Sequence, residues 1–168
     1  MVSILDLDPR WRTLMAKGGV MDIGFDHPSD WPHGERGEEP FVKEGDDQLT
    51  SELCRFGAAR FLRVTLSLPI RGSEEVLYVA LWAKVAHDVF YAYLDTLDGA
   101  PAPAPAAGTL ANNLTPLAGS GAELMIEFGD GTARPAATLT GVDDLSFDQL
   151  LDLYEAAGAL SRDELNGA

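Results

Sequence analysis

The segment from Arg60 to Val85 constrains the fold more than any other part of the chain. In residues 62–68 apolar side chains alternate with polar ones, which is the period of a strand with one buried face and one exposed face. Residues 76–85 are apolar at almost every position, a pattern typical of a central strand that is covered on both sides. The intervening residues 69–75 contain a proline, a glycine and charges, as turns do. This segment therefore predicts a long antiparallel hairpin.

Composition limits the classes of protein to which the chain can belong. Its 168 residues are 46% hydrophobic, which predicts one globular domain with its own core. It has 27 acidic and 12 basic residues and a net charge of -15, so nucleic acid and anionic membranes are disfavoured as partners, whereas a basic protein partner stays open. No apolar run has the length of a membrane span and no signal-like segment opens the chain, so we expect a cytoplasmic location.

The remaining elements can be placed around the hairpin. Residues 1–20 predict a short N-terminal helix or arm, which Asp8 caps. Residues 21–158 predict a single α+β domain, and residues 159–168 a C-terminal tail. Within the domain, residues 21–47 are rich in proline, glycine and carboxylates, and are interpreted as an irregular loop that its aromatic residues pin to the body.

The rest of the domain yields strands, helices and one connector. Ser146 and Gln149 form a capping box that begins a helix. His87 or Asp88 is predicted to cap a helix that runs to about Leu97. The other predicted segments are a strand at 48–56, a Pro/Ala-rich connector at 100–108, strands at 123–128 and 134–140, and a hairpin turn at 129–132. Together they predict an antiparallel sheet of about five strands, a meander plus a hairpin, with two main helices packed on it.

The densest group of potential metal ligands lies in the 21–47 loop. Carboxylates and imidazoles together suit Mn, Fe or Zn. Capping of turns explains the same residues without a metal, and their spacing matches no rigid ligand frame, so the sequence predicts no cofactor. The candidate ligands are Asp22, Asp26, His27, Asp30 and His33.

Two tryptophans and one carboxylate are the candidate ligand-binding residues. Trp82 falls in the predicted central strand and Trp31 in the loop, where an indole anchors a loop or faces a ligand. Asp26 precedes Trp31 in the same loop. If the loop leaves a pocket on the sheet, Trp31 and Trp82 would line it.

No catalytic motif stands out. The 119–121 segment lacks the frame of a serine nucleophile, and the glycines of 129–131 lack the spacing of a phosphate loop. The lone cysteine, Cys54, is interpreted as a structural thiol. We therefore expect a non-catalytic binding or protein-interaction domain. The alternatives are a metal-dependent enzyme that uses the Asp22–His33 loop, a small-ligand binder, and an inhibitor or immunity-type protein for a basic partner; self-association also stays open.

Several landmarks, taken in order, resemble a known bacterial family. They are Gly24-Phe25-Asp26-His27-Pro28-Ser29-Asp30-Trp31, Leu68-Pro69-Ile70, Leu81-Trp82-Ala83-Lys84-Val85 and Arg134-Pro135. In order and spacing they are similar to the uncharacterised proteins called domain of unknown function 2199, over residues 21–157. Many members of that family begin with a paired-cysteine motif, which this chain lacks, so no zinc or redox role is carried over. The resemblance implies a single intracellular domain and no activity.

Overall fold

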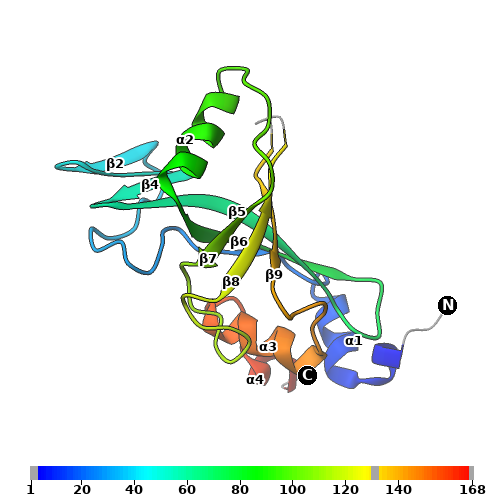
Figure 1. The fold of residues 1–168 in the computed structure, drawn as a ribbon. Helices are drawn as coiled ribbons and strands as arrows, with labels where there is room; N and C mark the ends of the chain where they lie inside the picture. The colour runs from blue at the N-terminus through cyan, green and yellow to red at the C-terminus, as the bar shows by residue number, and fades with distance from the viewer. Residues whose placement is uncertain (1–3, 130–132, 167–168) are drawn as a thin grey trace.

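A long hairpin is the centre of the fold. The computed structural model describes residues 4–129 and 133–166. In it, β5 (Ala59–Pro69) and β6 (Val76–Val85) are antiparallel and in register from Arg60 opposite Val85 to Pro69 opposite Val76. The hairpin predicted from the sequence is confirmed at both of its ends (Figure 1).

The hairpin closes into a barrel with three later strands. β6 pairs with β7 (Ala106–Leu110), β7 with β8 (Glu123–Glu127), β8 with β9 (Ala136–Leu139), and β9 returns to β5. Each step is antiparallel except the last, because a first and a fifth strand joined by antiparallel steps run in the same direction. The α+β class is confirmed, but the predicted antiparallel sheet of about five strands is wrong, since the sheet is mixed and contains a closed five-strand barrel.

Three further strands extend the sheet beyond the barrel as a wing. β4 (Leu53–Phe56) pairs with the first half of β5, β3 (Asp47–Thr50) with β4, and β2 (Phe41–Glu44) with β3. The predicted single strand at 48–56 is wrong, because the chain reverses between β3 and β4. There Thr50 Oγ1 accepts hydrogen bonds from the backbone N–H groups of Glu52 and Leu53, which closes the turn.

The 21–47 segment is more regular than its composition predicts. It contributes β2 and also β1 (Ile23–Gly24), which lies parallel to β6. The 100–108 connector is likewise shorter than predicted, since β7 begins inside it at Ala106. Local composition misses β1 because its partner β6 is distant in the sequence, whereas β2 forms a local hairpin with β3 within a polar, glycine-containing segment. The turn predicted at 129–132 lies largely outside the described residues.

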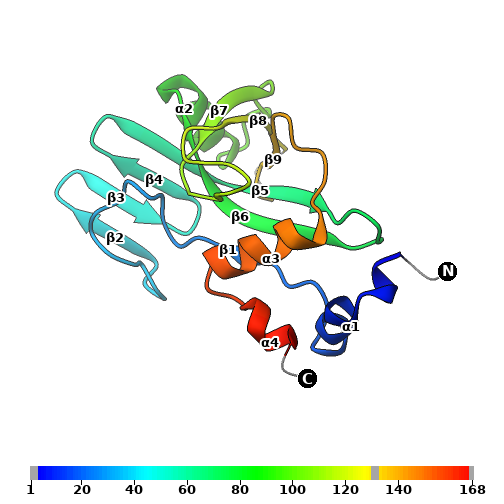
Figure 2. The ribbon, with the colours of Figure 1, turned by 90° about the horizontal axis from the view of Figure 1, so that it is seen from below.

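The helices gather at two ends of the sheet. η1 (Ile4–Leu7), α1 (Pro9–Ala16), α3 (Phe147–Ala156) and α4 (Arg162–Asn166) lie at one end, and α2 (His87–Thr96) lies at the other (Figures 1 and 2). The capping box at α3 is confirmed, with Ser146 and Gln149 bonded reciprocally. The predicted cap of α2 is wrong, because Ala86 occupies the N-cap without a side-chain hydrogen bond.

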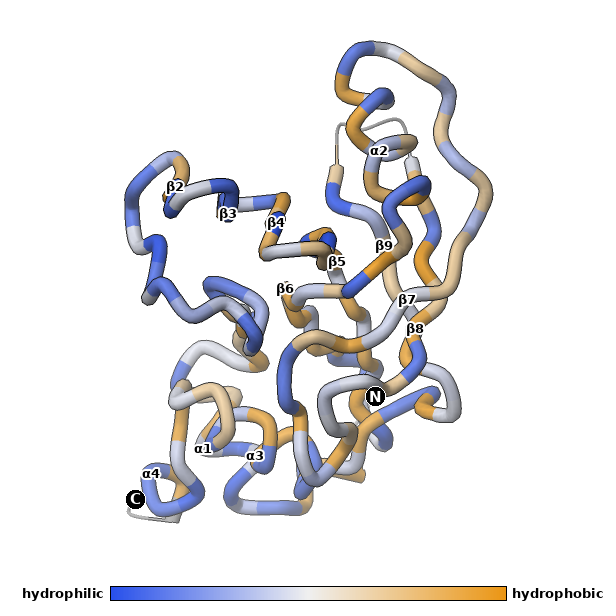
Figure 3. Tube along the Cα trace, turned by 60° about the vertical axis from the view of Figure 1, so that its left-hand side comes forward, coloured by the Kyte–Doolittle hydropathy of each residue, from blue (hydrophilic) through white to orange (hydrophobic). Residues whose placement is uncertain are grey.

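The two faces of the hairpin are buried in separate cores. The larger core fills the barrel and extends under α1 and α3, where Trp11 packs edge-on against Phe147 with ring centroids 5.4 Å apart. The smaller core lies on the other face of β5 and β6, below a loop that is hydrophilic over most of its length (Figure 3). Its buried members are Trp31, Leu49, Cys54, Phe61, Trp82 and Ala111. The division into residues 1–20, 21–158 and 159–168 stays a prediction.

Within residues 4–129 and 133–166, no helix is long and apolar enough to cross a membrane.

Barrel closure depends on the small size of Gly108. A Cβ atom there would lie 2.9 Å from Cδ1 of Ile126 and 3.0 Å from the carbonyl oxygen of Lys84. Gly108→Ala should therefore destabilise the protein by about 1–3 kcal/mol, the usual cost of overpacking. Urea denaturation measures this change. Gly119→Ala is the control, because a Cβ at Gly119 meets nothing within 4 Å, and equal stabilities of the two variants would contradict the prediction.

Candidate functional site

The predicted ligand-binding tryptophans anchor the loop over the smaller core. Trp31 is 3% exposed, and its Nε1 donates to the carbonyl of Gly34 at 3.1 Å. Trp82 is fully buried, and its Nε1 donates to the carbonyl of Phe25 at 2.9 Å. Neither indole presents a face to solvent in this conformation. The prediction that Trp31, Trp82 and Asp26 bind a ligand is not tested by this arrangement.

Asn112 fastens the same loop to the barrel, and sequence reasoning missed it. Its side chain is 2% exposed. Its Oδ1 accepts from the backbone N–H of Trp82 at 2.8 Å, and its Nδ2 donates to the carbonyl of His27 at 3.0 Å. This buried amide hydrogen-bonds one backbone group of β6 and one of the loop, so it fixes the position of the loop relative to β6. Only the tertiary contact distinguishes Asn112 from Asn113, which is exposed.

Arg63 lies on the loop face of β5, opposite Trp82 in the register. Its guanidinium carbon is 5.8 Å from the ring centroid of Trp82, a cation–π contact, and its Nη1 donates to the carbonyl of Ser51. Burial lowers the pKa of Arg63, because desolvation penalises the charged form. Asp26 lies close enough to oppose this shift, while its Oδ2 accepts from the backbone N–H of Arg36 at 2.6 Å.

The predicted metal ligands have separate partners. His33 Nε2 lies 2.9 Å from Asp47 Oδ2, and His27 Nδ1 lies 2.7 Å from the carbonyl oxygen of Pro28. Asp22 and Asp30 are exposed. Within the described residues, no three His, Cys, Asp or Glu side chains are grouped so as to hold a metal ion. A metal at Asp22, Asp26, His27, Asp30 and His33 stays a prediction.

A cavity lies on the opposite face of the wing, between β3, β4 and helix α2. Its volume is about 160 Å³, and it is open on one side. We call it the α2 groove, and its lining residues are Gln48, Thr50, Leu53, Cys54, Arg55, Phe90, Tyr91 and Leu94. The lining combines apolar side chains with an amide, a hydroxyl and a guanidinium, so the groove can bind an apolar group and a polar group together.

Strand alternation produces this groove. Leu49 on β3 and Cys54 on β4 are buried in the smaller core. Because side chains alternate along a strand, their neighbours project from the opposite face of the wing and line the groove; these are Gln48, Thr50, Leu53 and Arg55. Helix α2 follows β6 directly and crosses that face near β5, but it does not cover the wing (Figure 1). The groove is therefore the gap that the helix leaves beside the extended sheet.

Tyr91 lines the groove and is held in place by Arg60. Arg60 Nε donates to Tyr91 Oη at 3.3 Å, and its guanidinium carbon is 6.0 Å from the ring centroid. This hydrogen bond lowers the pKa of Tyr91, and the positive charges of Arg60 and Arg55 act in the same direction. Tyr91 is 40% exposed, so it is fixed in position while it remains accessible.

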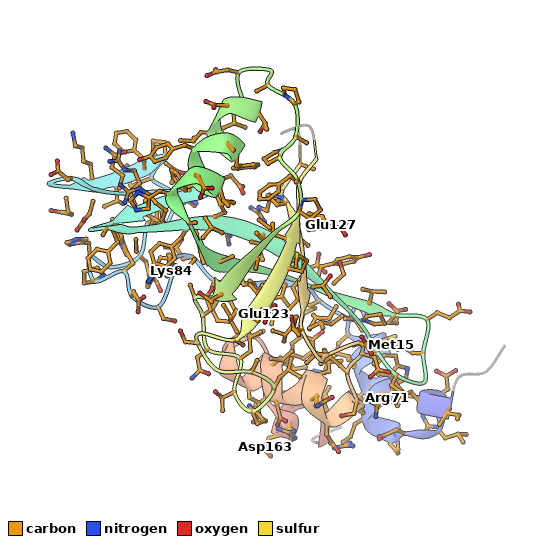
Figure 4. All side chains as sticks on the ribbon, in the orientation of Figure 1. Met15, Arg71, Lys84, Glu123, Glu127 and Asp163 are labelled. Atoms are coloured by element: carbon orange, nitrogen blue, oxygen red, sulfur yellow. The ribbon has the colours of Figure 1, made fainter. Side chains whose placement is uncertain are left out.

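A broader depression lies on the barrel at the β6–β7 junction. Its volume is about 700 Å³, and its ionisable lining groups are Lys84 and Glu123, which Figure 4 labels. They form no ion pair in the described residues. Backbone and small side chains make up the rest of the lining, which indicates no particular chemistry. The lining residues are Lys84, Val85, Ala86, Ala107, Gly108, Thr109, Gly121 and Glu123.

Fold and site together define an α+β barrel with a winged sheet and a small amphipathic groove. The chain belongs to the family described as "Uncharacterized protein conserved in bacteria (DUF2199)", which matches residues 17–150. The resemblance noted in the sequence is thereby confirmed. No curated protein and no solved structure matches the chain.

The loop over the smaller core should protect Cys54. Burial raises the pKa of this thiol from 9.0 to about 12, and the residue is 1% exposed. Since the thiolate is the reactive form, we expect very slow labelling by a disulfide reagent in the native protein and full labelling in denaturant. Asn112→Ala should accelerate native labelling, and should destabilise the protein by about 1–3 kcal/mol, because it leaves two backbone groups unpaired.

Asn113→Ala is the matched control, because Asn113 is the exposed neighbour of the same type. It should leave the labelling rate of Cys54 close to that of the unchanged protein. Rapid labelling of the unchanged native protein, or equal rates in the two variants, would show that Asn112 does not hold the loop over the core.

Proposed function

We propose that this protein is a non-catalytic binding domain whose α2 groove receives a segment of another protein. The observation that carries the proposal is the groove itself, an open hollow lined by aromatic, aliphatic and polar side chains beside an accessible tyrosine. Tyrosine supplies a large contact area with few rotamers and is enriched at the centres of protein interfaces.

The size of the groove favours a side chain over a whole metabolite. Its volume of about 160 Å³ is well below the roughly 300–1,000 Å³ typical of small-molecule sites. A peptide would place one or two side chains in the groove and lay the rest along the surface. Exposed apolar residues lie beyond the groove in two directions. Phe41 on β2 lies beside Thr50 in the register, and Leu97 lies at the end of α2.

The edge of the wing supports the same proposal. β2 stands last in the strand order, so one side of its backbone has no neighbouring strand in the described residues. An exposed edge accepts an added strand, a common way of binding an extended peptide. The groove and the edge of β2 lie on the same wing, so one extended segment can reach both.

Selection from a displayed library of random peptides tests the proposal. Selected peptides should shift the backbone amide resonances of groove residues such as Gln48, Tyr91 and Leu94. Tyr91→Ala should weaken their binding by about tenfold or more, because truncation of a central aromatic anchor costs at least about 1–2 kcal/mol. Binding constants from fluorescence anisotropy measure the effect.

Tyr78→Ala is the control, because Tyr78 is similarly exposed at 45% but lies on β6 outside the lining of the groove. It should leave peptide binding unchanged. The proposal fails if no peptide is enriched, or if selected peptides bind equally well to Tyr91→Ala.

A further inference from the structure

Two arginines stand directly opposite each other at the groove. Arg55 on β4 and Arg60 on β5 are register partners. Like charges that face each other across two strands repel, so this arrangement opposes folding of the free protein. Arg55 lines the groove, and Arg60 donates to Tyr91, which also lines it. The pair therefore places two positive charges at one wall of a cavity.

Arg60 is buried without a counter-ion in the described residues. It is 8% exposed. Its partners are neutral: Nη1 donates to the carbonyls of Gly57 and Ala59, each at 2.9 Å, and Nε donates to the Tyr91 hydroxyl. Buried charges in proteins are usually paired with an opposite charge, because desolvation of an unpaired ion is costly.

Arg55 has even fewer partners. Its Nε atom is buried and donates to no acceptor in the described residues, as is also true of Nε in Arg36 and Arg63. No ion pair forms there between Arg55 and a carboxylate. A buried N–H donor without an acceptor is uncommon in native proteins and calls for a physical explanation. A ligand that brings an acceptor into the groove supplies one.

Carboxylates pair with some arginines of this protein, but with neither Arg55 nor Arg60 in the described residues. The chain has 27 acidic and 12 basic residues, and several arginines elsewhere form ion pairs. Arg71 pairs with Asp144 at 2.7 Å and Arg134 with Glu52 at 2.8 Å. Arg12, Arg36 and Arg63 likewise have no ion pair in the described residues. Arg55 and Arg60 differ from these in facing each other across two paired strands.

The outer strand adds a third positive charge to the same face. Lys43 on β2 is the register partner of Gln48, which lines the groove, so both side chains leave the same side of the wing. Lys43 is exposed and forms no ion pair in the described part of the chain. Lys43 on β2, Arg55 on β4 and Arg60 on β5 thus lie on one face of the sheet.

We propose that Arg55 and Arg60 bind the carboxylate side chains of an acidic segment in a partner protein. The inference rests on the proposed function and names the chemistry of the segment that the α2 groove receives. A carboxylate can accept two parallel hydrogen bonds from a guanidinium, and its negative charge would offset the repulsion between the two arginines. Tyr91 and Leu94 would contact an apolar residue of the same segment.

A peptide fits this surface better than a nucleic acid does. The net charge of -15 repels a polyanion over the whole molecule, whereas a short segment with a few carboxylates meets only the local positive field. The apolar part of the lining, Leu53, Phe90 and Leu94, also matches an acidic peptide that carries one apolar side chain.

The test compares short labelled peptides that differ only in charge. One set contains Glu and Asp around a single Phe, and the other has Lys in place of each acid. At low salt the acidic set should bind at least about tenfold more tightly, the difference expected for one charge-assisted contact, and added salt should weaken it. Amide resonances of Arg55 and Tyr91 should shift on binding.

Arg55→Gln separates a recognition role from a structural one. It should weaken binding of the acidic peptides by about tenfold, while the midpoint of thermal unfolding of the free protein stays unchanged or rises, because a repulsive charge is removed. Arg55→Lys should retain part of the affinity. Arg12→Gln makes the same change of charge at an exposed residue of α1, away from the groove, and should leave binding unchanged.

The outcomes distinguish the inference from the proposed function. The inference would be overturned if the selected peptides lack acidic residues and bind the Arg55→Gln variant with the same affinity as the unchanged protein. The proposed function would then remain in place. Absence of any peptide binding in the groove would overturn both. Equal binding of a single-stranded oligonucleotide, or of inorganic phosphate alone, would overturn the assignment to an acidic peptide.

Discussion

The pairing of β5 with β6 is the constraint on which the rest of the structure depends. Both strands are longer than their other partners, so each pairs with two further strands of the sheet. β5 pairs with β4 over its first half and with β9 over its second half, while β6 pairs with β1 and β7. Side chains on both faces of the hairpin are buried, which divides the apolar residues between the barrel core and the smaller core. Loss of the hairpin would remove a wall from both.

The wing follows from this shared pairing. Because β9 occupies only the second half of β5, the first half is free to pair with β4, and β3 and β2 extend the sheet outward. One face of the wing is covered by the loop that Trp31 and Asn112 hold in place. The other face meets α2 only near β5. An amphipathic groove is the geometric result, and it places Arg55 opposite Arg60 with Tyr91 beside them.

The total charge of the chain and the charge of this groove have opposite signs. A net charge of -15 leaves a basic partner open, and no observation here tests it. At short range, however, a ligand responds to the charges that surround it, since interactions between exposed charges fall off within about 10 Å at moderate salt. Lys43, Arg55 and Arg60 share one face of the sheet, so recognition there would depend on their local positive field.

Features that depend on neighbours in the sequence were determined by the sequence itself. The alternation in β5 and the apolar run of β6 predicted the hairpin, Ser146 and Gln149 predicted the start of α3, and the ordered landmarks indicated the family. Features that depend on strand register or on distant pairing were decided by the tertiary structure. The parallel closure of β9 on β5, the split of 48–56 into two strands, the role of Asn112 and the meeting of Arg55 with Arg60 all required strand register. The physical reason is that residue type sets local backbone preference and burial, whereas cross-strand register arises only when the whole sheet assembles.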